Sequence, residues 1–99
     1  MEKIHLEYSA QAPASSRTQV GVVGSGDLEV LMEPGQTGKT IVNINTSVDG
    51  STPVWRAQMD RLFKQDHLPA LRVDINDFGA TPGVVQMRIA QALEEIGHD

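Results

Sequence analysis

The chain has 99 residues, a formal net charge of −5 and no Cys, and its 39% hydrophobic residues include one Trp, one Tyr and two Phe. The negative charge argues against a nucleic acid partner, because phosphate binding needs clustered Lys and Arg side chains. The lack of Cys excludes disulfides, thiolate metal sites and a Cys nucleophile.

The beginning of the chain, Met1 to His5, lacks the basic and then apolar pattern of a secretion signal. No apolar run approaches the length of a membrane span, which is about 20 residues. We therefore expect a cytoplasmic protein that has no membrane partner.

The first third of the chain is predicted to form strands. Apolar and polar residues alternate from Ile4 to Tyr8, as in a half-buried strand. The next segment, Ser9 to Thr18, is rich in Ala, Ser and Gln and is predicted to be a loop. Two short apolar runs, Val20–Val23 and Leu28–Met32, then flank a Gly-Ser-Gly-Asp tip, which is typical of a β-hairpin.

The tip of this hairpin places Ser25 between Gly24 and Gly26. Gly adopts positive φ angles without strain and carries no side chain. The hydroxyl group of Ser25 is therefore predicted to be accessible. Its position alone makes it a turn serine and gives it no chemical role.

The remaining elements alternate between strands and helices. Glu33–Gly38 is predicted to be a tight turn, and Ile41–Thr46 a strand. Ser51–Pro53 predicts a helix start with a hydroxyl cap and Pro in the first turn. The apolar residues of this helix share one face: Trp55, Met59, Leu62 and Phe63.

Alternation from Leu71 to Ile75 predicts another strand. Thr81–Pro82 then predicts a second capped helix that ends at Gly97. Its apolar face consists of Val85, Ile89, Ala92, Leu93 and Ile96.

The order of these elements predicts a small α+β fold. A strand–helix–strand run makes a parallel crossover, whereas the hairpin pairs antiparallel, so the sheet must be mixed. We expect one domain over residues 1–99, with both helices packed on one face of the sheet.

Two glycine-containing segments resemble catalytic motifs but do not match them. Gly35–Thr40 resembles the end of a phosphate-binding loop, yet Glu33 stands where the motif needs Gly, and a strand is expected where it needs a helix. Gly24–Gly26 resembles a nucleophile elbow, yet two strands are expected around it. We interpret the first as a turn that leads into a strand.

No metal or catalytic histidine site is predicted. His5, His67 and His98 have no metal-ligand spacing and are expected on the surface. Asp74–Gly79 resembles the opening of a calcium loop, but Val85 stands where that loop needs Glu. We interpret this segment as a strand end and turn before the second helix, and a partner-docking loop next to Ser25 is the alternative.

Several blocks of the chain resemble the malonate decarboxylase acyl carrier protein family, the delta subunit: residues 20–35, 46–50, 75–85 and 93–99. The acyl carrier (gamma) subunit of citrate lyase is a more distant relative, and residues 78–83 favour the malonate enzyme over it. Residues around Ser25 lack the Asp-Ser-Leu motif of fatty-acid carrier proteins.

The resemblance implies that Ser25 carries a phosphoribosyl-dephospho-coenzyme A group through a phosphodiester, derived from triphosphoribosyl-dephospho-coenzyme A. Gly24, Gly26 and Asp27 complete the attachment turn, in which Asp27 orients the turn, meets a basic residue of a partner or caps its own turn. The thiol of the group is acetylated, malonyl replaces acetyl, and decarboxylation regenerates the acetyl-carrier.

The implied partners are the acyl-carrier transferase subunit, the malonyl-carrier decarboxylase subunits, the prosthetic-group transferase and a malonyl transferase. The chain would then be a non-catalytic carrier of malonate catabolism. The alternatives are a citrate lyase carrier, a noncovalent interaction or scaffold domain, and an independent small enzyme. The last is disfavoured because no acid–base constellation accompanies Ser25.

Overall fold

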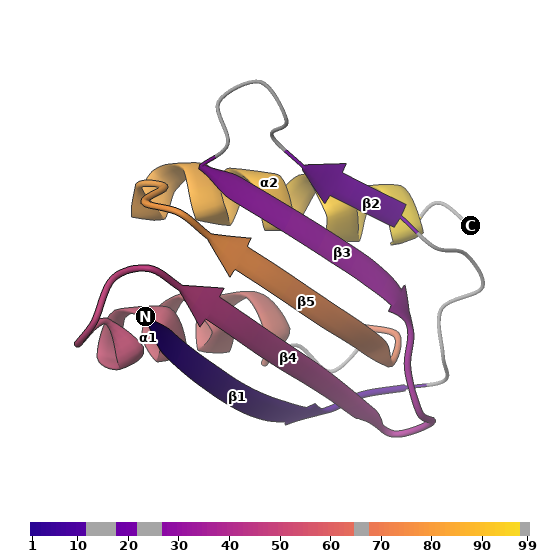
Figure 1. The fold of residues 1–99 in the computed structure, drawn as a ribbon. Helices are drawn as coiled ribbons and strands as arrows, with labels where there is room; N and C mark the ends of the chain where they lie inside the picture. Colours follow the sequence, from indigo (N-terminus) through magenta and orange to yellow (C-terminus); the bar gives the residue numbers. More distant parts are fainter. Residues whose placement is uncertain (12–17, 22–26, 65–67, 98–99) are drawn as a thin grey trace.

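The computed structural model describes residues 1–11, 18–21, 27–64 and 68–97, which form one sheet and two helices (Figure 1). The elements in chain order are β1 (Glu2–Ser9), β2 (Thr18–Gly21), β3 (Leu28–Pro34), β4 (Lys39–Thr46), α1 (Thr52–Phe63), β5 (Leu71–Asp77) and α2 (Pro82–Gly97).

The five strands follow the spatial order β1-β4-β5-β3-β2. β4 and β5 are parallel neighbours joined through α1, while the β1–β4, β3–β5 and β2–β3 pairs are antiparallel. Both helices lie behind the sheet in Figure 1. The predicted α+β fold with a mixed sheet, a hairpin and a β-α-β crossover is confirmed.

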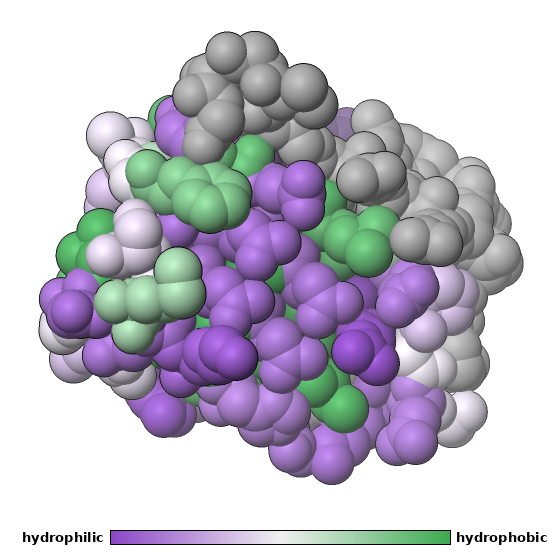
Figure 2. Space-filling view, viewed as in Figure 1, coloured by the Kyte–Doolittle hydropathy of each residue, from purple (hydrophilic) through white to green (hydrophobic). Residues whose placement is uncertain are grey.

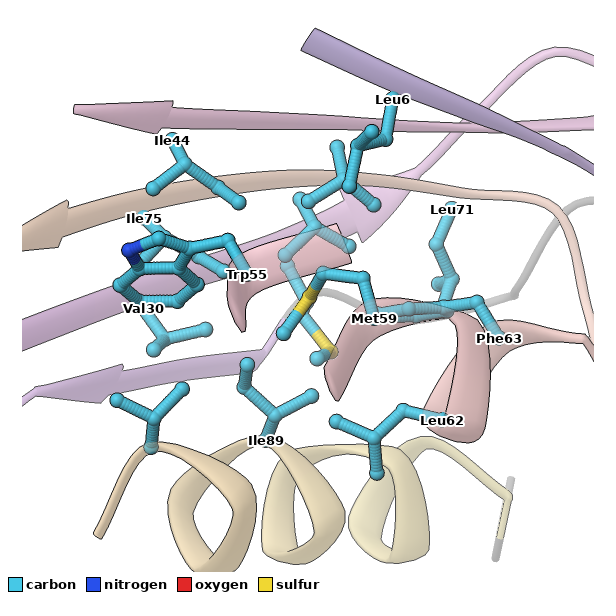
Figure 3. Packing of buried hydrophobic residues seen from close by; sticks show 14 of the residues in the cluster. Leu6, Val30, Ile44, Trp55, Met59, Leu62, Phe63, Leu71, Ile75 and Ile89 are labelled. Carbon is cyan, nitrogen blue, oxygen red and sulfur yellow. The ribbon is translucent and has the colours of Figure 1, made fainter. Parts of the chain in front are cut away.

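The core lies between the sheet and the helices. Alternate residues of the four longest strands point into it, because successive side chains of a strand face opposite sides. The predicted apolar face of α1, which includes Trp55 and Met59, is buried against them (Figure 3). Val85, Ile89 and Ala92 bury the corresponding face of α2.

The two helix starts differ in how they are capped. Thr81 accepts a hydrogen bond from the Val84 N–H at its Oγ1, 3.4 Å away, so the predicted cap of α2 is present. The predicted cap at Ser51 is wrong: its hydroxyl donates to the carbonyl of Val48 at 3.1 Å and makes no hydrogen bond to the helix. The backbone of Ser51, with φ −95° and ψ 3°, is not in the extended conformation from which an N-cap hydroxyl accepts from the helix N–H groups.

The strand boundaries also differ from prediction in several places, and Glu33 and Pro34, predicted in the tight turn, belong to β3. The first hairpin strand was predicted over Val20–Val23, whereas β2 covers Thr18–Gly21, and positions 22 and 23 lie outside the described residues. Ser9 and Thr18, predicted as loop ends, belong to strands. Short strands without clear alternation leave such boundaries weakly determined.

The other face of the sheet is polar and has no helix over it, as the mostly hydrophilic surface in Figure 2 shows. Hydrogen bonds connect its strands, including Asn45 Nδ2 to Asn76 Oδ1 at 3.2 Å and Asn76 Nδ2 to Glu29 Oε1 at 3.2 Å. The helices therefore cover one face, and the loops at the ends of the strands remain accessible.

Candidate attachment site

The predicted attachment turn lies at the end of the hairpin formed by β2 and β3. β2 ends at Gly21 and β3 begins at Leu28, and the two strands are antiparallel. Ser25, Gly24 and Gly26 lie outside the described residues. The described strands nevertheless show that a strand follows the turn, whereas a nucleophile elbow would require a helix there.

Asp27 is the residue of the predicted turn that the structure describes. It is half-buried, and its backbone carbonyl accepts a hydrogen bond from the N–H of Phe78 at 2.9 Å. The next residue, Leu28, pairs with Asp77 at the end of β5. The loop between β5 and α2 therefore lies against the base of the turn.

The carboxylate of Asp77 organises this loop and is 4% exposed. Its Oδ1 accepts from the backbone N–H groups of Gly79 at 3.1 Å and Ala80 at 2.8 Å. Its Oδ2 accepts from the hydroxyl of Thr46 at 2.8 Å, and the same hydroxyl oxygen accepts from the Val48 N–H at 3.1 Å. One buried carboxylate thus holds both the loop after β5 and the loop after β4.

Apolar side chains stand exposed on and beside these loops. Phe78 is 61% exposed, Val48 48% and Val54, in the first turn of α1, 51%. A groove of about 180 Å³ is lined by apolar side chains that include Val48, Val54, Ala80 and Val85. The base of the predicted turn therefore adjoins an apolar surface.

The groups with shifted pKa values lie on β1. The hydrogen bond to Glu7 at 2.9 Å, assisted by one to Asn43 at 2.7 Å, raises the pKa of the exposed His5. Burial, together with the hydrogen bond that its hydroxyl donates to Asp60, raises the pKa of Tyr8. His5 is exposed, as predicted, whereas His67 and His98 lie outside the described residues.

The rejected motifs have the structures expected for them. Gly35–Thr40 forms a turn that leads into β4, and Asp74–Gly79 forms the end of β5 and the loop that follows. Within the described part of the chain, no group of three or more His, Asp or Glu side chains is arranged to hold a metal ion. No described helix has the length and apolar character needed to span a membrane.

Sequence reasoning missed the role of Asp77. Its segment was compared with a calcium loop, whereas the carboxylate caps backbone N–H groups two and three residues later in the chain. An Asp followed by Gly two residues on is a recognised turn signal. That signal indicates the local turn, but it does not reveal the link to Thr46 on β4.

Comparison with protein families places the chain clearly. The family model described as ACP, malonate decarboxylase delta subunit (MdcD), matches residues 15–96. The chain belongs to this family. The recognition made from the sequence blocks is thereby confirmed.

Members of the malonate decarboxylase delta subunit family align over the full chain. The malonate decarboxylase acyl carrier protein of Stutzerimonas stutzeri is 54% identical over 99 residues, covering 100% of both chains. The protein of that name from Azotobacter vinelandii is 54% identical over 98 residues and 99% of both. A chain in the crystal structure of a Pseudomonas malonate decarboxylase hetero-tetramer in complex with malonate is 54% identical with a TM-score of 0.90, covering 98% of this chain and 100% of that one.

Proposed function

We propose that the chain is the acyl carrier subunit of a malonate decarboxylase and that Ser25 carries its phosphoribosyl-dephospho-coenzyme A group. The observation that carries the proposal is family membership over residues 15–96, together with relatives of the same name that match the whole chain. The solved relative belongs to a hetero-tetramer, which supports a role inside a multi-subunit complex.

The residues of the turn suit covalent attachment. A phosphodiester requires a hydroxyl group, and the Ser25 hydroxyl is less hindered than that of a threonine. Gly24 and Gly26 have no side chains to obstruct the pocket of an attaching enzyme. The backbone carbonyl of Asp27 is held by the N–H of Phe78, so one end of the turn has a fixed base.

The fold also supplies a cation suited to a phosphate group. Arg88 lies on α2, the helix that packs against β2 and β3. Its Nε is buried and makes no hydrogen bond. A buried donor without a partner carries a free-energy cost that an anion would relieve. An anion that reached this Nε would be stabilised there, and backbone N–H groups of a Gly-rich turn would add donors.

The bound group would supply the thiol that carries acyl groups as thioesters, which this chain without Cys lacks. The chain itself would present the group to the active sites of other subunits. Tethering would raise the local concentration of the acyl group to about the millimolar range. The partners would be the acyl-carrier transferase subunit, the malonyl-carrier decarboxylase subunits and the enzymes that attach and load the group.

Intact mass spectrometry tests the attachment. The chain is co-expressed with the prosthetic-group transferase and the enzyme that makes its substrate. We expect a mass increase equal to one phosphoribosyl-dephospho-coenzyme A group, and no increase in the Ser25→Ala variant. A modified Ser25→Ala chain, or an unmodified wild-type chain, would contradict the proposal.

The alternatives make different predictions in a reconstituted complex. A malonate decarboxylase carrier supports turnover of malonate and not of citrate, whereas a citrate lyase carrier does the reverse. A noncovalent scaffold keeps its activity in the Ser25→Ala variant. An independent enzyme turns over malonate as an isolated chain. We expect malonate turnover only in the complex and only with Ser25 present.

A further inference from the structure

Exposed apolar side chains beside the attachment turn stand on an ordered backbone. The N–H of Phe78 is bonded to Asp27, and the next two N–H groups are bonded to the Asp77 carboxylate. Val48 is held through Thr46 to the same carboxylate. The backbone of these loops is therefore already ordered before a partner binds. Binding then loses little backbone entropy, which favours affinity.

Val48, Val54 and Phe78 form what we call the docking surface. Val48 and Val54 line one groove, and Asp77, which precedes Phe78, lines it as well. Figure 2 shows hydrophobic side chains at this end of the mostly hydrophilic open face, over the loop that follows β5. A single exposed apolar residue needs no explanation, but two that line a groove and a third on the adjoining loop, beside the predicted attachment turn, indicate an interaction site.

The charge around this end of the sheet is negative. Glu2, Glu29 and Asp49 carry negative charges there, against Lys3 and the terminal ammonium group, which pairs with Asp49 at 2.8 Å. Complementary charge speeds encounter between proteins and selects among partners. The surface therefore fits a partner whose binding site is basic at its rim.

We propose that the docking surface binds a partner subunit with an apolar recess for Phe78 surrounded by Lys or Arg side chains. This inference rests on the proposed function, because a carrier must present position 25 to the active site of a partner. The hydrogen bond between Phe78 and Asp27 ties the surface to the base of the turn. Seating Phe78 in the recess therefore fixes how the turn faces the partner.

A binding experiment with the full chain tests the docking surface. The Ser25→Ala chain cannot be loaded at position 25, so its affinity reports the protein surface alone. It is titrated by calorimetry onto the malonate decarboxylase complex assembled without its carrier. Adding Phe78→Ala is expected to weaken Kd about tenfold or more, as for the central aromatic residue of an interface.

The matched control is Met87→Ala, which removes a 49% exposed apolar side chain from α2. We expect it to change Kd less than about twofold, since most exposed side chains outside an interface contribute little. Phe78→Leu keeps an apolar side chain and should bind more tightly than Phe78→Ala. Circular dichroism of each variant verifies the fold, which an exposed side chain should not affect.

A separate variant tests whether the negative charges around the docking surface contribute to partner binding. Glu29→Gln removes one negative charge from β3 beside the turn, and we expect it to slow association about threefold at low salt. The difference should shrink as salt is raised to about 0.3 M, because ions screen exposed charges. An association rate unchanged by Glu29→Gln and by salt would contradict the basic rim.

The remaining outcomes separate the two proposals. Equal Kd values for Phe78→Ala and Met87→Ala would overturn the docking surface, even if mass spectrometry shows a loaded Ser25. Binding by the loaded wild-type chain but not by Ser25→Ala would also overturn it, because the prosthetic group would then supply the affinity. If neither the loaded nor the unloaded chain binds, the proposed carrier function is contradicted as well.

Discussion

Asp77 links β5, β4 and the loop beside the predicted attachment turn through one carboxylate. It is buried on the core face of the sheet, where its neighbours along β5 are apolar. A buried carboxylate is costly unless hydrogen bonds compensate for the water it loses. Here three donors do so: the Thr46 hydroxyl and the N–H groups of Gly79 and Ala80. The side chain therefore fixes the geometry of two loops.

Replacing this carboxylate should destabilise the fold. Asp77→Ala leaves three donors without their acceptor, and we expect it to lower the free energy of unfolding by about 2–4 kcal/mol. Asp77→Asn keeps one acceptor oxygen and should cost less. Urea denaturation measures both. Asp49→Asn, whose side chain is 77% exposed, is the control and should change stability by less than about 1 kcal/mol.

At the scale of single elements, the turn between β3 and β4 shows two separate demands for glycine. Gly35 donates its N–H to the Ala70 carbonyl at 3.0 Å, and a Cβ on it would lie 2.8 Å from the backbone carbon of Leu71. Gly38 has a φ of +84° and open space where a Cβ would lie. Close packing therefore requires glycine at the first position, and backbone conformation favours it at the second.

Substitution by Ala and by Asn distinguishes these demands. Gly35→Ala should lower the free energy of unfolding by about 1–3 kcal/mol, because the added Cβ overpacks against β5. Gly35→Asn should lower it at least as much. Gly38→Ala should lower the free energy of unfolding by about 1–2 kcal/mol, because Ala is strained in the left-handed conformation. Gly38→Asn should lower it less, because Asn tolerates that conformation. Urea denaturation compares the four variants. Equal costs for Ala and Asn at position 38 would contradict this explanation.

Some elements could be predicted from the sequence more accurately than others. The alternation over Ile4–Tyr8 and Leu71–Ile75 and the helical face around Trp55 identified their elements, because burial imposes a period on them. The hairpin was identified, but its first strand begins at Thr18, two residues before the predicted start. The Ser51 hydroxyl donates to the Val48 carbonyl and accepts no hydrogen bond from the helix N–H groups, which depends on a backbone conformation that the sequence pattern does not determine.

The site was predictable to a smaller extent. Ser25 was chosen by resemblance and by the glycines around it, and its attachment stays a prediction. The proximity of Phe78 to Asp27 depends on the pairing of β3 with β5, elements separated by more than 30 residues. The docking surface likewise requires Thr46 and Asp77 to meet across two parallel strands. Such contacts follow from topology, which local patterns do not encode.

At the scale of the whole molecule, one core joins all the larger elements. Ile89 of α2 and Met59 of α1 belong to the same buried cluster as Val30, Ile44 and Ile75 of the sheet. In Figure 3 the labelled side chains from both helices point into the space beneath the strands. Both helices bury their apolar faces in this one cluster, and the cluster does not divide into two cores. We therefore propose that residues 1–99 unfold as one cooperative unit.

Urea denaturation followed by two probes tests this unit. Trp55 is the one Trp of the chain and is 5% exposed, so its fluorescence reports the core beside α1, while far-UV circular dichroism reports every helix and strand. Both transitions should have the same midpoint. Ile89→Ala deletes a fully buried side chain from α2, and we expect it to lower the free energy of unfolding by about 2–5 kcal/mol by both probes. A Trp55 transition that stays in place while the dichroism transition shifts would mean that α2 unfolds separately from the part of the core around α1.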